Sequence, residues 1–410
     1  MTLRSLLLGS AAAFVAVSGA RAADAVVIAE PEPVEYVRVC DAFGAGYYYI
    51  PGTETCVKFS GYVYFQVGAE GYDGYNSPDF LTYGTLGALP DGTAMEDGWV
   101  DNVRGRFEVD ARSSTEWGTL RGFIRFDAQT NGENADAAFL MNNGFLQLGG
   151  FRAGYTESVW VDSYHAGAAS YGSHSWGSLS YGDQKRQQIS YTYGEEEGFA
   201  ATISLEDGSV VNEFPIYVVD EDGNVIEVGS EEILTSHGYM PDVVATANYK
   251  GDWGAVWARI GYDHDRNNGL DGTDGSSGLG VMAGLQYNIP RWEGSSLRVL
   301  GFYANSDNAY GTISPAMAYF GGYGTSKWSV IGSYYQQFTE TFGASVGFQW
   351  FDDYYEAFSD VGTDLDGYTA EIALVWTPID NFEVRTEVYY DKIEDLDGTA
   401  SGFLRFTRFF

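Results

Sequence analysis

The sequence predicts an all-β protein that crosses a membrane as a closed antiparallel barrel of sixteen strands, with eighteen strands left open as an alternative. Three observations predict this fold. Apolar and polar residues alternate along many segments of nine or ten residues, which is the period of a β-strand. Aromatic residues stand at the ends of several apolar rows. Long and short gaps alternate between the segments, as expected when one barrel end carries long loops and the other tight turns.

The composition of the 410 residues excludes several other classes. There are 57 acidic and 22 basic residues, so the formal net charge is −35, yet 16% of the residues are aromatic. A disordered acidic chain is poor in aromatic residues, and a nucleic-acid-binding protein needs a basic surface. No run after the N-terminus reaches the roughly 18 apolar residues of a membrane-spanning helix. A large acidic β protein remains.

Residues 1–22 have the features of a cleaved export signal. Arg4 supplies the positive start, Leu6 to Val17 form the apolar stretch, and Ala20, Arg21 and Ala22 form an A-x-A cleavage site. A single anchoring helix is the alternative, but the apolar stretch is too short to span. We therefore expect three parts: the signal at 1–22, a periplasmic N-terminal segment at 23–56, and the barrel at 57–410.

Cys40 and Cys56 are the two cysteines of the chain. Export to an oxidising compartment allows them to form a disulfide, which would contribute ~3 kcal/mol in the chain-entropy model. A metal or redox pair is the alternative. It is disfavoured because the chain has no C-x-x-C spacing and no histidine nearby.

Residues 103–112 show why the segments are read as strands. Val103, Phe107 and Val109 fall on one face, whereas Arg104, Arg106 and Glu108 fall on the other. A strand of about 9–11 residues crosses a bilayer when it is tilted, and aromatic residues favour its two interfaces. A soluble β-sandwich also alternates, but it does not need aromatic residues at the ends of its apolar rows.

The expected strands lie near 57–69, 102–113, 118–129, 138–148, 151–156, 187–194, 198–206, 243–250, 253–263, 278–288, 295–304, 327–337, 342–352, 367–377, 381–391 and 399–410. The long gaps, including the third at 157–186, are assigned to the extracellular side and the short gaps to the periplasm. Residues 314–323 also resemble a strand. They are assigned to the sixth long loop, because an extra strand would make the number odd.

Three segments carry a resemblance to a known family. They are residues 30–63, which contain both cysteines, residues 145–158 (FLQLGGFRAGYTES), and residues 402–410 (GFLRFTRFF). With the leader sequence SLLLGSAAA, they resemble outer-membrane porins of the alphaproteobacterial type found in rhizobia and Brucella. The resemblance implies a homotrimeric general-diffusion porin in the outer membrane, with the third long loop folded into the pore. The last strand, ending in Phe410, resembles the signal read by the barrel-assembly machinery.

A pore function directs attention to charged residues on the predicted lumen face. Six arginines, here called the arginine wall, cluster in the first third of the barrel: Arg104, Arg106, Arg112, Arg121, Arg125 and Arg152. The third long loop carries Glu157, Asp162 and Asp183. If this loop folds inward, its carboxylates face the arginine wall and create a transverse field at a constriction. The alternative is a solvated face on which Glu108, Asp110 and Asp127 balance the arginines.

We therefore expect a water-filled channel for small hydrophilic solutes and ions. The overall charge predicts a weak preference for cations, because an acidic channel concentrates them. The expected partners are two further copies of the chain, outer-membrane lipid, lipopolysaccharide and the assembly machinery. We expect no nucleic acid, cofactor, metal ion or catalytic residue, and therefore no enzyme activity.

Two alternative functions remain. A sugar-specific channel usually has a track of aromatic residues, but Tyr62, Tyr64 and Phe123 form no continuous track in the predicted lumen. A secreted all-β carbohydrate-binding protein would be soluble without detergent.

Overall fold

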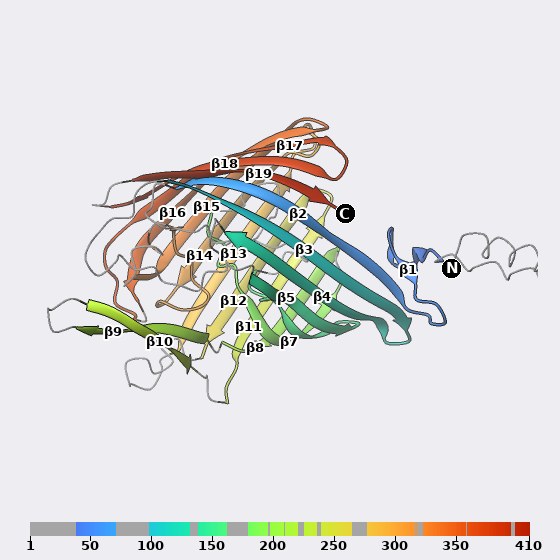
Figure 1. Ribbon diagram of the computed structural model, residues 1–410, viewed down its shortest axis with the longest axis horizontal. Coiled ribbons are helices and arrows are strands. Elements are labelled where there is room, and N and C mark those ends of the chain that lie inside the picture. The colour runs from blue at the N-terminus through green and yellow to red at the C-terminus, as the bar shows by residue number, and fades with distance from the viewer. Residues whose placement is uncertain are drawn as a thin grey trace, which may run out of the picture.

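The computed structural model describes residues 38–70, 98–131, 138–161, 179–195, 197–208, 210–219, 225–235, 239–264, 277–315, 317, 323–357, 359–394 and 398–410. The predicted export signal lies outside these residues. Sixteen of the described strands form a closed antiparallel barrel (Figure 1). They are β2 (Cys56–Glu70), β3 (Gly98–Thr115), β4 (Gly118–Asn131), β5 (Ala138–Leu148), β6 (Phe151–Glu157), β7 (Lys185–Gly194), β8 (Gly198–Glu206), β11 (Asp242–Gly251), β12 (Gly254–Asp263), β13 (Gly278–Asn288), β14 (Ser296–Ala304), β15 (Tyr323–Thr339), β16 (Phe342–Glu356), β17 (Gly367–Ile379), β18 (Phe382–Ile393) and β19 (Thr399–Phe409).

Each barrel strand pairs with its neighbours along the chain, apart from two pairings that bridge a gap in sequence. β8 pairs with β11, and β19 pairs with β2, which closes the sheet. Closure leaves no unpaired strand edge, so the backbone groups can be satisfied in a lipid environment. The prediction of a sixteen-strand barrel is therefore confirmed.

Three described strands lie outside the barrel. β9 (Val210–Val219) and β10 (Val225–Thr235) form a separate two-stranded sheet within what was expected to be the long loop at 207–242. The short β1 (Tyr48–Tyr49) follows a turn of 3-10 helix at Asp41–Phe43 and pairs with the beginning of β2. In Figure 1 the β9–β10 hairpin lies at one end of the barrel and β1 lies at the other, beside the tight turns.

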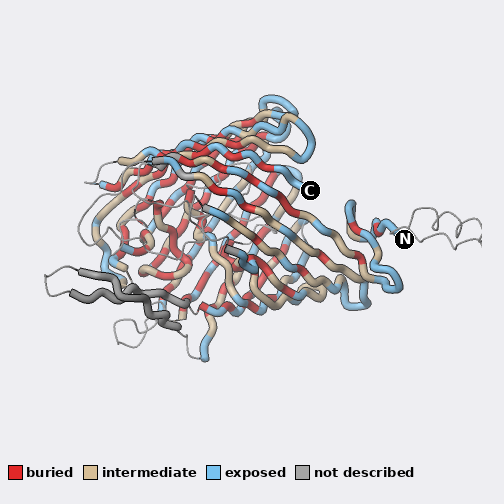
Figure 2. The backbone as a smooth tube through the Cα atoms, in the orientation of Figure 1, coloured by how far each residue is buried: buried red, intermediate tan, exposed pale blue. Residues whose placement is uncertain are grey.

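Buried and exposed residues alternate along the barrel strands, as Figure 2 shows. On β3, Arg104 is 4% exposed and points inward, whereas Phe107 is 44% exposed on the outer face. The same relation holds on β12, where Arg259 is buried and Ile260 is exposed. Much of the interior is therefore polar and the outside is apolar, which is the arrangement that a barrel in lipid requires.

A β-bulge explains why residues 138–148 alternate poorly. Arg125 pairs with Asn143 and the next residue, Phe126, pairs with Met141, so Asn142 is the extra residue in β5. The bulge reverses the alternation along the strand. Phe139 and Met141 are exposed before it, whereas Phe145 after it is buried inside the barrel.

The described part of residues 314–323 adds no strand to the barrel before Tyr323, where β15 begins. The Met317 N–H donates a hydrogen bond to the Ser314 hydroxyl over 3.2 Å. Assignment of this stretch to a loop was therefore correct for the residues described. Within the described chain, no helix is long and apolar enough to cross a membrane.

Candidate pore and its lining

A cavity of about 910 Å³ lies inside the barrel on the side where the chain closes. Its lining comes from β2 to β7 and from β18 and β19, and it contains four of the six arginines of the arginine wall: Arg106, Arg121, Arg125 and Arg152. The cavity lining also includes Glu157, Glu383 and Thr407. Predicted lumen residues from strands distant in sequence thus meet around one cavity.

Carboxylates on the same wall hold several of these arginines. Arg106 on β3 makes a two-pronged contact with Asp127 on β4, with both N···O distances at 2.8 Å. Arg104 donates to Gln129 over 2.6 Å. The Asp127 side chain is only 3% exposed, so this ion pair is shielded from water.

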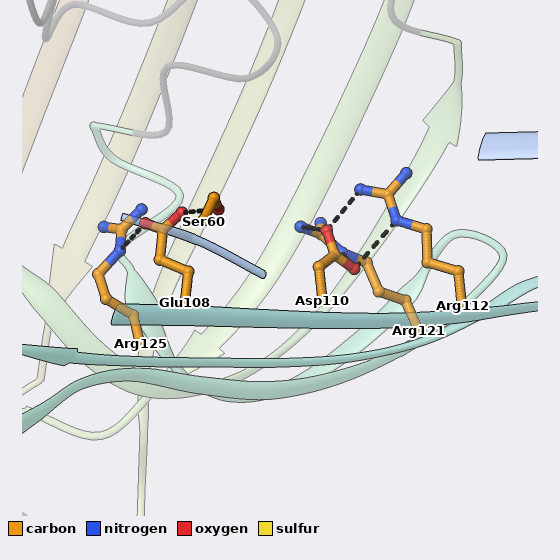
Figure 3. Close-up of polar contacts among 6 residues, drawn as sticks. All are labelled: Ser60, Glu108, Asp110, Arg112, Arg121 and Arg125. Carbon is orange, nitrogen blue, oxygen red and sulfur yellow. Dashed lines mark hydrogen bonds and ion pairs between the residues drawn. The ribbon is translucent and has the colours of Figure 1, made fainter. Parts of the chain in front are cut away.

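Figure 3 shows two further ion-paired groups on this wall. Arg112 and Arg121 both donate to Asp110, each through one contact of 3.0 Å and one of 2.8 Å. Arg125 donates to Glu108 over 2.7 Å, and Ser60 donates to the other oxygen of the same carboxylate over 3.0 Å. Three carboxylates thus bind four of the six arginines, so the charge of the arginine wall is compensated in part.

Aromatic rings support the guanidinium groups. Tyr62 and Tyr64 stack with ring centres 5.6 Å apart, and Phe123 and Phe145 stack at 5.2 Å. The Arg121 guanidinium lies 5.0 Å from both phenylalanine ring centres. Such cation–π contacts restrict the orientation of an arginine while its donors remain available. The sequence singled out Tyr62, Tyr64 and Phe123, but not Phe145, because the bulge at Asn142 changes its face.

The three predicted loop carboxylates have different outcomes. Glu157, at the end of β6, lines the cavity together with the arginines. Asp183 is exposed, and Asp162 lies outside the described residues. Lys185 was not predicted. It lies at the start of β7, where Asp183 and Glu157 attract its charge and Arg106 and Arg125 repel it.

The described ends of the third long loop, residues 158–161 and 179–184, are attached to the inner wall. Glu206 accepts hydrogen bonds from the Ser158 hydroxyl over 2.6 Å and from the Val159 N–H over 3.0 Å. The Gln349 amide binds the backbone of Ser180 twice, with distances of 2.7 and 2.9 Å. The expected inward fold is therefore seen at both ends of this loop.

A second loop, the one between β14 and β15, also packs against the inner wall, which the sequence analysis did not predict. The Tyr310 hydroxyl donates to Asp242 over 3.0 Å, and its ring meets Trp160 edge-on with centres 5.4 Å apart. A Cβ atom on Gly261 would lie 2.4 Å from the Tyr310 ring, and one on Gly280 would lie 2.5 Å from Tyr310 Cβ. These two glycines on β12 and β13 provide the space for Tyr310.

The two inward loops form an apolar cluster with lumen-facing side chains of β11 to β15. The cluster contains Val159, Trp160, Val161, Leu179, Tyr181, Val244, Trp257, Met282, Leu300, Phe302, Tyr310 and Ile331. The lumen face of these strands is therefore partly apolar. Burial by the loops removes this apolar surface from water and stabilises the inward position.

Further arginines lie inside the barrel away from the predicted wall. Arg385 on β18 contacts Glu383 at 3.0 Å and Glu387 at 3.3 Å, and Arg405 on β19 donates to Gln66 over 2.7 Å. Their position follows from the same alternation of lumen and lipid faces. They were not predicted because they lie outside the dense cluster of arginines between positions 104 and 152.

Cys40 and Cys56 form the predicted disulfide, with Cα atoms 6.0 Å apart. At the other chain end, the Phe410 N–H donates to the Gly61 carbonyl, and the Gly61 N–H donates to the Phe410 carbonyl, each over 3.0 Å. Phe410 thus extends the pairing between the last and first barrel strands. Among the described residues, no group of three or more His, Cys, Asp or Glu side chains is placed to hold a metal ion.

Comparison with known proteins agrees with this architecture. The sequence model described as the Porin subfamily matches residues 24–402. Porin Omp2b of Brucella suis is 39% identical over 280 residues, which cover 64% of this chain and 66%, just under two thirds, of that porin.

Solved structures show the same fold. The outer-membrane channel DcaP of Acinetobacter baumannii superimposes with a TM-score of 0.58 at 13% identity, covering 88% of this chain and 99% of DcaP. The anion-selective porin of Comamonas acidovorans gives a TM-score of 0.52 at 11% identity, covering 87% of this chain and 100% of that porin. The barrel places the protein in the outer membrane. The chain belongs to the Porin subfamily.

Proposed function

We propose that this protein is a general-diffusion porin that lets small hydrophilic solutes and ions cross the outer membrane passively. The observation that carries the proposal is the cavity of about 910 Å³, lined by charged and polar side chains together with aromatic rings, inside a barrel with an apolar outer face. Such a cavity gives water and dissolved solutes a polar path, and the outer face anchors the barrel in lipid. A soluble carbohydrate-binding protein is incompatible with the fold and the family.

We further propose that the arginine wall shapes the constriction together with Glu157, Asp162 and Asp183. Glu157 supports this assignment because it lines the same cavity as Arg106 and Arg125. Asp183 and Lys185 interact electrostatically beside them, which brings both charge signs close to the wall. Opposed charges around a narrow polar space orient water and polar solutes and disfavour apolar ones.

Weak cation preference is part of the proposal. Asp110, Asp127 and Glu108 compensate part of the charge of the nearby arginines, which reduces the attraction of the wall for anions. The formal charge of −35 then dominates the long-range field and concentrates cations at the mouths. This field weakens as added salt screens it.

We propose that three copies of the chain assemble in the membrane. Support comes from the family and from OmpT of Vibrio cholerae, which has a structure titled as a trimer form and superimposes with a TM-score of 0.51 at 13% identity. Membrane lipid and lipopolysaccharide would contact the apolar outer face and the long loops. The last strand, ending in Phe410, would present the assembly signal.

A substrate-specific channel is the second candidate function. It is favoured by the stacked pairs Tyr62–Tyr64 and Phe123–Phe145 on the lumen side of neighbouring strands. Rings of this kind can bind the apolar face of a sugar. Guanidinium groups lie over these rings, however, with Arg106 4.8 Å from the centre of Tyr62. Guanidinium groups on the ring faces leave less ring surface for a sugar. This favours general diffusion over a sugar-specific channel.

Swelling of proteoliposomes in a series of sugars distinguishes the two functions. General diffusion predicts that the swelling rate falls smoothly with solute size and rises linearly with solute concentration. Liposomes without protein provide the baseline. A rate that saturates for one sugar while equally large sugars remain slow would support the substrate-specific channel. Absence of swelling above the baseline for every sugar would contradict both.

A further inference from the structure

The disulfide-bonded segment at residues 38–56 is fixed to the barrel end that carries the tight turns. In addition to the disulfide, β1 pairs with β2 through Tyr48 opposite Val57 and Tyr49 opposite Cys56. Within the segment, the Cys40 N–H donates to the Tyr47 carbonyl over 2.8 Å. Tyr47 is therefore held in place by a covalent link, a strand pairing and a local hydrogen bond.

Tyr47 contacts the inner wall, whereas its neighbour does not. Tyr47 is only 4% exposed, whereas Tyr48 is 43% exposed. The Arg112 guanidinium lies 5.3 Å from the Tyr47 ring centre, and the Lys58 ammonium lies 5.9 Å from it. The Tyr47 hydroxyl also forms a hydrogen bond with Asp110. One residue of the N-terminal segment thus touches three charged residues of the barrel.

Asp110 connects Tyr47 to the cavity. Its carboxylate is bound by Arg112 and by Arg121, with N···O distances of 2.8 to 3.0 Å (Figure 3). Arg121 lines the cavity and rests on the rings of Phe123 and Phe145. The contacts therefore run without interruption from the N-terminal segment, through one carboxylate, to the cavity wall.

The charges of this cluster do not cancel. Lys58, Arg112 and Arg121 carry three positive charges and Asp110 carries one negative charge. The Tyr47 ring lies against two of the cations, Lys58 and Arg112. Loss of this contact would expose positive charge at the mouth and favour anions there.

We propose that Tyr47 is a residue that determines ion preference: the disulfide-bonded segment forms part of the periplasmic mouth, and Tyr47 both positions Asp110 and shields Arg112 and Lys58. This inference rests on the proposed channel function. It assigns a role to a segment outside the barrel strands, and it makes the disulfide a determinant of permeation as well as of stability.

The test measures the K⁺/Cl⁻ permeability ratio of purified protein in planar bilayers under a KCl gradient. For Tyr47→Leu we expect the ratio to fall roughly twofold, as when one partly screened charge becomes exposed. Tyr47→Phe keeps the ring but lacks the hydroxyl, so its ratio should fall in the same direction by less. Tyr48→Leu is the matched control in the same segment and should leave the ratio unchanged.

Replacing both cysteines, Cys40→Ser with Cys56→Ser, provides an independent variant. It keeps the Tyr47 side chain but removes the covalent link that holds it against the wall, so the permeability ratio should fall toward that of Tyr47→Leu. Mobility of unheated and heated samples on a detergent gel shows whether each barrel has assembled. If Tyr47→Leu does not assemble, the milder Tyr47→Phe decides the question.

Assembled Tyr47 variants with the wild-type permeability ratio would overturn the proposal, as would an equal fall for Tyr48→Leu. These results differ from a failure of the proposed function. If that function were wrong, the wild-type protein itself would give no ion conductance and no ratio could be measured.

Discussion

The guanidinium of Arg259 on β12 donates a hydrogen bond to the carbonyl oxygen of Val159 in the third long loop, over 3.2 Å. The same side chain donates to the carbonyl of Trp160. A residue of the barrel wall thus holds two consecutive peptide groups of a loop that is about a hundred positions away in sequence. This relationship makes Arg259 a specific target for testing whether the loop sets the pore width.

Arg259→Met should loosen the inward loop. It removes two charge-assisted hydrogen bonds to buried carbonyls. This loss lowers the free energy of unfolding by about 2 kcal/mol or more. We expect noisier single-channel currents and a changed mean conductance. Arg291→Met is the control, because Arg291 lies exposed in a short turn. Equal current noise in the two variants would contradict a holding role for Arg259.

Arg106→Gln should increase the preference for cations. The substitution removes the partner of Asp127 and leaves a buried carboxylate beside the cavity. Breaking such a pair from one side costs about 3 kcal/mol or more of stability, and the remaining negative charge attracts cations. Zero-current potentials in a KCl gradient measure the preference. The double variant Arg106→Gln with Asp127→Asn should return toward the wild-type value. Wild-type potentials in the single variant would exclude this ion pair from the permeation path.

Gly261→Leu should displace the loop that carries Tyr310. Even a Cβ atom at this position would lie 2.4 Å from the Tyr310 ring, so the larger side chain forces the ring away. Displacement breaks the hydrogen bond to Asp242, and the conductance should change. Gly301→Leu on β14 is the control, since no heavy atom lies within 4 Å of a Cβ there. Unchanged conductance for Gly261→Leu would show that this loop does not limit the pore.

Much of the barrel could be predicted from the sequence, because lipid on one side and water on the other impose a strict alternation on every strand. The strand near 138–148 was predicted despite its weak pattern, and its bulge at Asn142 explains both the weak pattern and the missed Phe145. The β9–β10 hairpin was not predicted. It pairs only with itself outside the barrel, where the constraint from lipid does not act.

The candidate site could be predicted only in part. Alternation placed Arg104 and Arg106 in the lumen, since it depends on neighbours along one strand. It could not show that Arg106 pairs with Asp127, or that Tyr310 lies against Gly261, because these contacts depend on register and loop path. Tyr47 precedes the barrel, so the alternation gave no information about it.

Tyr47 should titrate at unusually high pH. Burial, followed by the hydrogen bond to Asp110, raises the pKa of Tyr47 to about 12 from its ordinary value of 10.0. The protonated Tyr47 hydroxyl therefore contributes to the free energy of unfolding. This contribution is fully present below pH 10 and is lost as the pH rises through about 12. A spectrophotometric titration of wild-type protein minus Tyr47→Phe should show one phenol with a midpoint near pH 12. A midpoint near 10 would mean that Tyr47 is freely solvated.

The central claim is a water-filled channel with weak cation preference, and the zero-current potential of wild-type protein in a planar bilayer tests it most directly. We predict stepwise increases of conductance as channels insert. Under a KCl gradient, the side of lower concentration should become positive by less than the full potassium potential. Absence of conductance steps would contradict a channel. A potential of the opposite sign would contradict the claim that the acidic charge of the chain outweighs the arginine wall.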